Sequence, residues 1–256
     1  MDARPSCRVC ESPYTLFVQN VVSHRRPGLS FPQFFCMDCR GFFHTSGYCD
    51  RAHAQIDFDE LSRWRDNHMA IQSRLCHELI VRLPGIQSAC DIGHGLGWFM
   101  KACRDFGLKP YGFELNPHCH EHASKVLGLE CCLGRFDASH NASYDLIAAI
   151  MVFEHLEEPR DLFREMVRHL NRDGAIYISV PFAHRRDWKN LWQLDQSPAQ
   201  TTANVFFDTD AHITQFTVDG MSRMGVSLGA RSAESFVSAD TYANSPGSYE
   251  GVLFRF

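Results

Sequence analysis

The segment that decides the fold is Asp91-Ile92-Gly93-His94-Gly95-Leu96-Gly97, a glycine-rich loop between two apolar stretches. Residues 88–92 before it predict a buried strand, and residues 96–106 repeat apolar side chains at helical spacing. Glycines at such a junction allow a tight turn and let a ligand approach the backbone, because they carry no Cβ atom. The first N–H groups of the helix add hydrogen-bond donors. The segment predicts a ligand-binding loop, and a simple strand-to-helix turn is the alternative.

Strands and helices alternate from this loop to the end of the chain. Asn116-Pro117 predicts the start of a helix, since asparagine caps helices and proline fits their first turn. The expected elements are strands at 110–114, 129–133, 144–150, 175–180, 235–237 and 252–256, helices at 116–127 and 160–170, and a turn at 171–174. This alternation predicts an α/β fold, a doubly wound Rossmann-like parallel sheet with helices on both faces. Ligands of such sheets bind beyond the carboxyl ends of the strands.

An acidic residue ends the second strand of this pattern. Glu114 lies 23 residues after Asp91, where a carboxylate can accept hydrogen bonds from the ribose hydroxyls of a nucleoside. The loop reads Gly-x-Gly-x-Gly and lacks the Gly-x-Gly-x-x-Gly spacing of dinucleotide folds. We therefore predict a nucleoside ligand without a pyrophosphate. Asp91, which opens the loop, suits a cationic group on that ligand.

Four parts of the chain carry a resemblance to a known family: Cys90–Gly97, Tyr111–Pro117, Tyr144–Ile147 with Phe153–Pro159, and Asn171–Phe182. They resemble the motifs of class I methyltransferases dependent on S-adenosylmethionine (SAM), in particular the ubiquinone-biosynthesis-like small-molecule branch. The resemblance implies methyl transfer to oxygen, nitrogen or carbon of a small-molecule acceptor. It implies cofactor contacts at Asp91, Gly93, His94, Gly95, Gly97, Glu114, Leu115, Asn116, Arg135, Phe136, Ile150 and Met151. The segment at Arg135-Phe136 departs from the Gly-Asp-Ala pattern of the family.

Two histidines are candidates for a catalytic base. His155 follows the strand at 144–150, where the family often carries a histidine. His212 lies in a segment that resembles the start of a late helix bordering the substrate pocket in this branch. A neutral imidazole can accept a proton from a hydroxyl acceptor. A role in shaping the local loop is the alternative for both. Further substrate-holding candidates, with solvated loops as the alternative, are His184, residues 185–188 and His24-Arg25-Arg26.

Two cysteine pairs, Cys7-x-x-Cys10 and Cys36-x-x-Cys39, are separated by 25 residues. Four thiolates at paired spacing can close a tetrahedral Zn²⁺ site, which is structural because it leaves no open coordination position. Coincidental cysteines in a reduced core are the alternative. We predict a zinc-ribbon module at 1–48, connecting helices at 49–84 and a SAM-dependent methyltransferase domain at 85–256. Cys131-Cys132 is expected to belong to the core.

Composition narrows the remaining choices. The chain has 256 residues, 45% of them hydrophobic, which suits a globular protein. It shows no apolar run that could cross a membrane and no signal-peptide core, so a cytoplasmic location without membrane partners is expected. The net charge of −5 argues against nucleic acid as a partner. An RNA methyltransferase that docks nucleic acid through the zinc module is the alternative function, and a non-enzymatic SAM-fold protein is a third. The oligomeric state is not specified.

Overall fold

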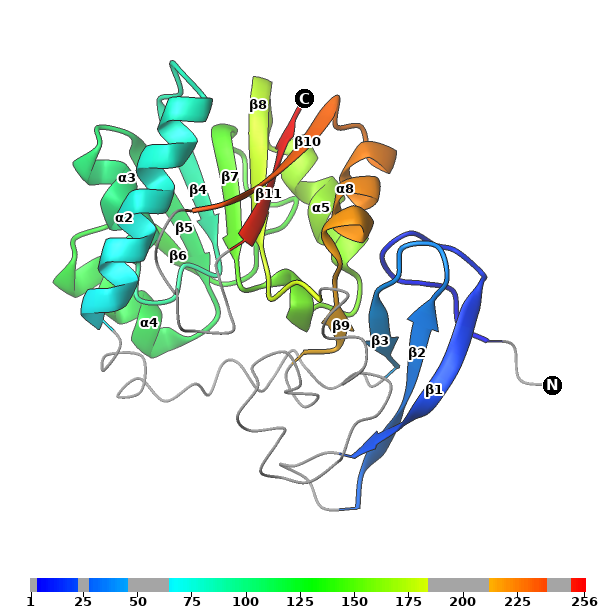
Figure 1. Ribbon diagram of the computed structural model, residues 1–256. Coiled ribbons are helices and arrows are strands. Elements are labelled where there is room, and N and C mark those ends of the chain that lie inside the picture. Colours follow the sequence, from blue (N-terminus) through cyan, green and yellow to red (C-terminus); the bar gives the residue numbers. More distant parts are fainter. Residues whose placement is uncertain (1–3, 23–27, 46–64, 184–211, 239–249) are drawn as a thin grey trace.

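The computed structural model describes residues 4–22, 28–45, 65–183, 212–238 and 250–256 (Figure 1). The strands of its larger sheet are β4 (Ser88–Ile92), β5 (Lys109–Glu114), β6 (Cys131–Leu133), β7 (Tyr144–Ile150), β8 (Leu170–Ser179), β10 (Ser232–Val237) and β11 (Glu250–Arg255). Within the described residues this seven-stranded sheet has the order β10-β11-β8-β7-β4-β5-β6. Strands β4 to β8 pair in parallel, and β11 pairs antiparallel with both β8 and β10.

The order of the strands reverses at the central strand β4. The chain runs through β5 and β6 to one edge, and then returns to build β7 and β8 on the other side of β4. The crevice at this reversal, beyond the carboxyl ends of β4 and β7, is where open α/β sheets bind ligands. The loop that opens at Gly93 lies there, directly after β4.

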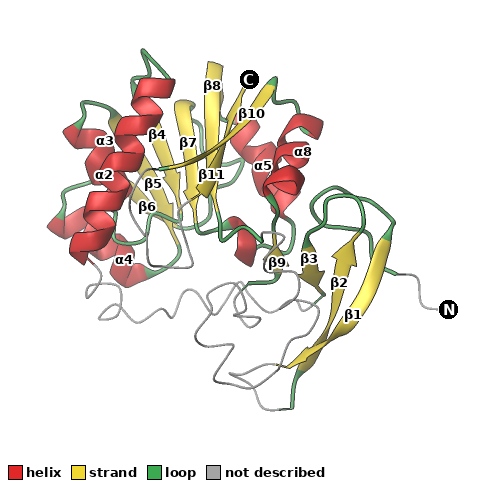
Figure 2. Ribbon diagram, in the orientation of Figure 1, coloured by secondary structure: helices red, strands yellow, loops and turns green. Residues whose placement is uncertain are grey.

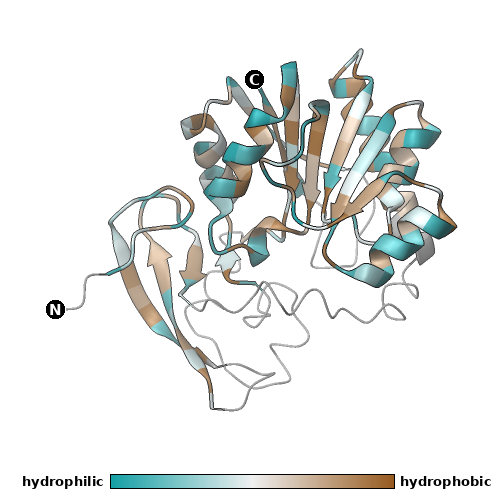
Figure 3. Ribbon diagram, turned by 180° about the vertical axis from the view of Figure 1, so that it is seen from behind, coloured by the Kyte–Doolittle hydropathy of each residue, from teal (hydrophilic) through white to brown (hydrophobic). Residues whose placement is uncertain are grey.

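Helices cover both faces of the sheet (Figure 2). They are α2 (Arg65–Arg82), α3 (Trp98–Asp105), α4 (Pro117–Glu121), α5 (Pro159–Arg168) and α8 (Val218–Ser227). On β7, Leu146 and Ala148 pack with α2 and α3, whereas Ile147 and Ala149 belong to the cluster of α5 and α8. This alternation follows from the period of two along a strand, and both faces of the central strands carry apolar stretches (Figure 3). The expected doubly wound α/β fold is confirmed.

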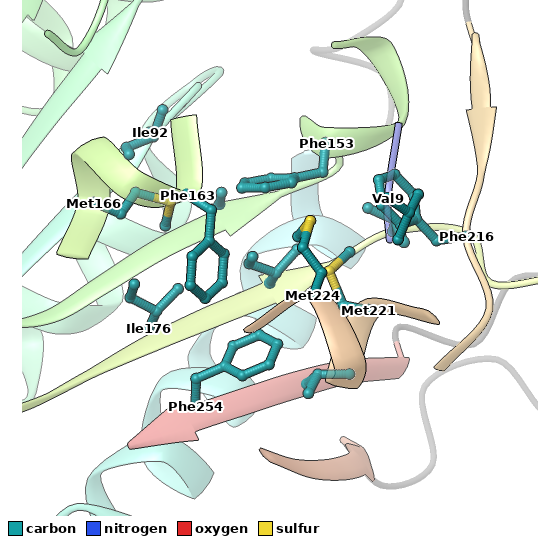
Figure 4. Close-up of a cluster of buried hydrophobic side chains, with 14 of the residues drawn as sticks. Val9, Ile92, Phe153, Phe163, Met166, Ile176, Phe216, Met221, Met224 and Phe254 are labelled. Carbon is teal, nitrogen blue, oxygen red and sulfur yellow. The ribbon is translucent and has the colours of Figure 1, made fainter. Parts of the chain in front are cut away.

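A second sheet is formed by the N-terminal residues together with a distant segment. Its strands are β1 (Thr15–Val22), β2 (Ser30–Cys36), β3 (Phe42–His44) and β9 (Thr214–Gln215), paired antiparallel in that order. The buried core is continuous between the two sheets. Val9 of the N-terminal segment packs in one cluster with Phe216 and Met221 (Figure 4).

Several expected boundaries differ from the structure. The helix predicted at 116–127 begins as expected with Asn116, whose side chain accepts hydrogen bonds from the N–H groups of His118 and Cys119, but it continues after α4 as a π-helix, His122–Val126. The helix predicted at 96–106 is shorter, and β10 extends the strand predicted at 235–237 to Ser232. Cys131 and Cys132 are only half-buried, because β6 is an edge strand.

The turn predicted at 171–174 lies inside β8 rather than before it. Tyr144 of β7 pairs with Leu170 of β8, and Leu146 of β7 pairs with Ala175 of β8. Residues 171–174 of β8 therefore bulge out of the ladder. Asp173 takes a left-handed φ of 60°, and the Asn171 side chain donates a hydrogen bond to the Asp145 carboxylate at 2.7 Å. The turn-forming residues 171–174 therefore form a β-bulge and not a connection between two elements.

Helix α2 accounts for the second part of the predicted connecting helices, and residues 49–64 lie outside the described residues. The substrate-holding candidates at 24–26 and 184–188 also lie outside them. Among the described helices, none is both long and apolar enough to span a membrane.

Candidate functional site

The glycine loop is held by the carboxylate of Glu114. One carboxylate oxygen, Oε2, accepts a hydrogen bond from the N–H of Gly95 at 2.8 Å. The other, Oε1, accepts from the N–H groups of Leu115 at 2.7 Å and Asn116 at 2.8 Å. An ionised carboxylate has about four acceptor positions, so these three bonds fix its orientation and leave capacity for a ligand.

Two glycines of the loop have the left-handed backbone conformation that favours glycine. Gly93 has a φ of 71°, and a Cβ atom there would lie 2.6 Å from Cγ2 of Val152. Gly95 has a φ of 52°, and a Cβ atom would meet nothing within 4 Å. Gly93 therefore lets the loop pass close to the segment after β7, whereas Gly95 faces open space.

That space is a cavity of about 730 Å³ beyond the carboxyl ends of β4, β5 and β7. Its lining includes most of the residues expected to contact a cofactor, namely Asp91, Gly93, His94, Gly95, Glu114, Leu115, Asn116, Arg135, Phe136, Ile150 and Met151. Gly97 is not in the lining, since it is the N-cap of α3 and packs against Ala123 and Leu129. Met151 has a left-handed φ of 59°, which is uncommon for a residue with a side chain and turns the chain sharply after β7.

Asp91 is a buried carboxylate in this lining, with an exposed fraction of 4%. It makes no hydrogen bond or ion pair with any residue that the structure describes. Burial, followed by the nearby charge of Glu114, raises the pKa of Asp91 well above its usual value. A ligand with a cationic group would reverse this effect by supplying the missing counter-charge.

Three polar atoms in the lining are buried and have no hydrogen-bond partner among the described residues: Oε1 of Gln72, Nε2 of His94 and Nε1 of Trp98. Buried polar atoms normally have partners, so these atoms indicate a polar ligand. Gln72, Trp98 and Asp137 also line the cavity, although the sequence pattern did not predict them as site residues. Trp98 follows the loop directly, but nothing in the spacing of α2 distinguishes Gln72.

The two candidate bases lie against each other. His155 ends a short 3₁₀ helix, Phe153–His155, and lines the cavity, whereas His212 is buried beside β9. The centroids of the two imidazole rings are 4.8 Å apart. Glu154 lies with them, its Oε1 atom 3.7 Å from Nε2 of His155. The fold therefore brings together two residues that are 57 positions apart in the sequence.

A family profile described as "Methyltransferase domain" matches residues 61–223, which is more than half of the chain. The chain belongs to this methyltransferase family. It is accordingly a SAM-dependent methyltransferase, and the enzyme class expected from the glycine loop and Glu114 is confirmed. A search of curated proteins gives no match.

Solved structures show the same fold at low sequence identity. A candidate O-methyltransferase from Nostoc punctiforme is 14% identical with a TM-score of 0.55, and the match covers 72% of this chain but only 55% of that one. A SAM-dependent methyltransferase from Thermotoga maritima is 17% identical (TM-score 0.56, 77% and 95% covered). The magnesium protoporphyrin IX methyltransferase of Synechocystis, solved with bound SAM, is 16% identical (TM-score 0.51, 78% and 85% covered).

The four paired cysteines of the methyltransferase also come together. Sγ of Cys7 lies 3.5 Å from Sγ of Cys39, and Sγ of Cys10 lies 3.5 Å from Sγ of Cys36. All four sulfur atoms lie within 4.8 Å of one another. Sulfur atoms on a tetrahedron with Zn–S bonds of about 2.3 Å would be about 3.8 Å apart, so the observed arrangement fits this ion.

Glu154 of the methyltransferase makes a testable contribution to stability. The residue is 1% exposed, neither carboxyl oxygen has a hydrogen-bond partner in the part of the chain that the structure describes, and burial raises the pKa of Glu154 to about 8. An unfolded glutamate titrates near about 4.3, so the folded chain binds an extra proton between these two pKa values, and stability falls as the pH rises through that window.

Glu154→Gln removes this titration. We expect the variant to gain stability over the wild type, and the gain to grow by up to about 3 kcal/mol between about pH 5.5 and pH 8.5.

Urea unfolding of both proteins at the two pH values measures this difference. Glu130→Gln, at an exposed glutamate on the loop before β6, is the matched control and should show no such growth. A gain from Glu154→Gln that does not change with pH would mean that this carboxyl is not held neutral by burial.

Proposed function

We propose that the cavity binds SAM and that the methyltransferase transfers its methyl group to a small-molecule acceptor at oxygen, nitrogen or carbon. One observation carries the proposal: Glu114 clamps the glycine loop through Gly95 at the edge of the cavity and keeps acceptor capacity for a ribose. The lining fits the rest of this cofactor. Asp91 would receive the ammonium group, and the apolar side chains of Leu115 and Phe136 would face the adenine.

When bound, SAM supplies an electrophilic methyl group on a sulfonium. The protein's contribution is to orient the acceptor in line with that group and to accept a proton from it. We assign the proton to His155, which lines the cavity, and propose that His212, which lies behind it at a ring distance of 4.8 Å and outside the lining, supports it. The topology explains why the two histidines are neighbours. His155 comes after β7, and His212 comes shortly before β9, which lies beside the same turn.

The small-molecule assignment rests on the type of site and on similar folds. The cavity has a volume of about 730 Å³, and the Synechocystis enzyme of the same fold is named for a small molecule, magnesium protoporphyrin IX. The motifs of the ubiquinone-biosynthesis-like branch favour an acceptor of similar size.

We further propose that Cys7, Cys10, Cys36 and Cys39 hold one structural zinc ion. The support is the mutual distance of the four sulfur atoms, together with their burial, which leaves three of them almost inaccessible to solvent. A closed set of four thiolates leaves no position for substrate, so the ion would stabilise the small sheet. Cysteines can bind zinc only while they are not oxidised to disulfides, and the cytoplasm keeps them reduced. We therefore propose a cytoplasmic location.

Removing the Glu114 carboxylate tests cofactor binding. Glu114→Ala loses the hydrogen bonds to the ribose and frees the loop at Gly95, so the affinity for S-adenosylhomocysteine should fall by about 1.5–3 kcal/mol, or roughly 10- to 150-fold. Calorimetric titration of both proteins measures the change. Glu121→Ala, on the exposed side of α4, is the matched control and should bind like the wild type. Equal affinity of Glu114→Ala and wild type would rule out the proposed ribose site.

A further inference from the structure

Thr217 lies where the N-terminal sheet meets helix α8. Its hydroxyl donates a hydrogen bond to the carbonyl of Cys39 at 2.6 Å and accepts one from the N–H of Gly220 at 3.0 Å. The side chain is thus the N-cap of α8 and also a direct link to the second cysteine pair. We infer that Thr217 is a positioning residue that fixes His212 in the acceptor site by tying β9 and α8 to the N-terminal sheet. The inference rests on the proposed role of His212.

The packing around this link is tight and buried. Thr217 is 8% exposed, and a Cβ atom on Gly220 would lie 3.1 Å from Cβ of Cys39. A threonine hydroxyl that both donates and accepts cannot be replaced by an apolar group without leaving a buried carbonyl unpaired. The link therefore fixes the distance between the Cys39 turn and the start of α8.

The same sheet holds the segment just before Thr217. Strand β3 pairs with β9, where Phe42 lies opposite Gln215. The N–H of His44 donates to the carbonyl of Ile213 at 3.0 Å, and the Gln215 side chain donates to the carbonyl of His212 at 3.0 Å. Residues 212 to 217 are therefore attached to the N-terminal sheet at both ends, although most of the catalytic domain precedes them in the chain.

A second connection ties the N-terminal segment to helix α5. The Arg160 guanidinium at the start of α5 donates to the carbonyl of Val9 at 2.9 Å and pairs with Glu11 at 3.0 Å. Helix α5 follows the turn that carries His155. The N-terminal residues thus contact both α5, which follows His155, and β9, which follows His212, and the two imidazole rings lie 4.8 Å apart. Loosening the Thr217 link should expose His212 without disturbing the glycine loop.

The test uses chemical modification of individual histidines. Thr217→Val removes the hydroxyl at similar size, and diethyl pyrocarbonate followed by peptide mass spectrometry reports the modification rate of each histidine in the full chain. The variant loses both hydrogen bonds of the hydroxyl, of which the bond to Cys39 ties the segment to the N-terminal sheet. We expect His212 to react about two- to tenfold faster, the change in a local opening equilibrium on losing that one tie. His169, buried at the C-terminal end of α5 in the catalytic domain, should keep its rate. Affinity for S-adenosylhomocysteine should stay within about twofold, because no bond to the loop is lost.

Two further variants separate positioning from general destabilisation. Thr217→Ser keeps the hydroxyl and should restore the wild-type rate at His212. Thr15→Val removes a comparable buried hydroxyl, bonded to the carbonyl of Pro5 at 2.8 Å, from the same sheet but away from β9. It should leave His212 unchanged. The inference is overturned if Thr217→Val leaves His212 unchanged, or if it speeds His212 and His169 equally. Failure of the wild type to bind S-adenosylhomocysteine would contradict the proposed function instead, and the histidine rates would still judge the link.

Discussion

Replacing Cys36 with serine should reduce the zinc content of the protein from one ion per chain to essentially none. Cys36 ends β2, is completely buried and lies 3.5 Å from Cys10 through their sulfur atoms. A serine hydroxyl is a poor ligand for zinc in a set of thiolates, and three remaining sulfurs cannot close the tetrahedron. Structural zinc contributes about 10–16 kcal/mol of apparent binding free energy in small zinc domains, so its loss should unfold the N-terminal sheet.

Elemental analysis of the purified proteins measures the metal, and limited proteolysis shows whether residues 4–45 remain protected. Cys131→Ser is the matched control, because Cys131 is half-buried on β6 and far from the cluster in the sequence. A wild-type protein that contains no metal and still protects its N-terminal sheet would show that the four thiols form a reduced core. Retention of one zinc by Cys36→Ser would exclude this cysteine as a ligand.

Removing the imidazole of His155 should lower the rate of methyl transfer by about 10²–10⁴-fold if it acts as the base. His155 lines the cavity that contains Glu114 and Asp91, and its ring contacts that of His212. A base must be neutral to accept a proton, so the wild-type rate should fall on the acid side of its pH profile. His155→Ala should lose that acid limb together with the rate, while its affinity for S-adenosylhomocysteine changes little.

The rate is measured as S-adenosylhomocysteine formed from SAM with a panel of hydroxyl-containing small molecules, from which an acceptor is first selected. His118→Ala, at an exposed histidine on α4, controls for loss of an imidazole outside the proposed acceptor site. A loss of less than tenfold with an unchanged pH profile would assign His155 a positioning role. In that case the proton would have to leave through another group.

The sequence predicts the cofactor side of the site well because that side is local. The glycine loop follows β4 and Glu114 ends the neighbouring parallel strand β5, so their spacing in the chain is enough to bring them together. The backbone N–H groups that occupy Glu114 were not predictable, since they depend on the turn taken by residues after the strand. Gln72 comes from a helix before the sheet, where no motif marks one polar residue among many.

The acceptor side was harder to predict because it depends on contacts between distant segments. β9 has only two residues, too few to show the alternation that identifies a strand, and it pairs with β3 from the opposite end of the chain. Composition and cysteine spacing predicted a separate N-terminal module. The structure shows a core shared with the catalytic domain, in which Val9, Phe216 and Met221 pack together. The link at Thr217 follows from this packing and has no signature in the sequence.

A structure of the wild-type protein with S-adenosylhomocysteine is the most direct measurement. We predict that the ligand lies in the cavity between Gly93 and Met151, with its ribose hydroxyls at the carboxylate of Glu114 and its ammonium group at Asp91. The sulfur atom should point toward His155. Density for the ligand outside this cavity, or a cavity that stays empty at saturating ligand concentration, would contradict the proposed methyltransferase site.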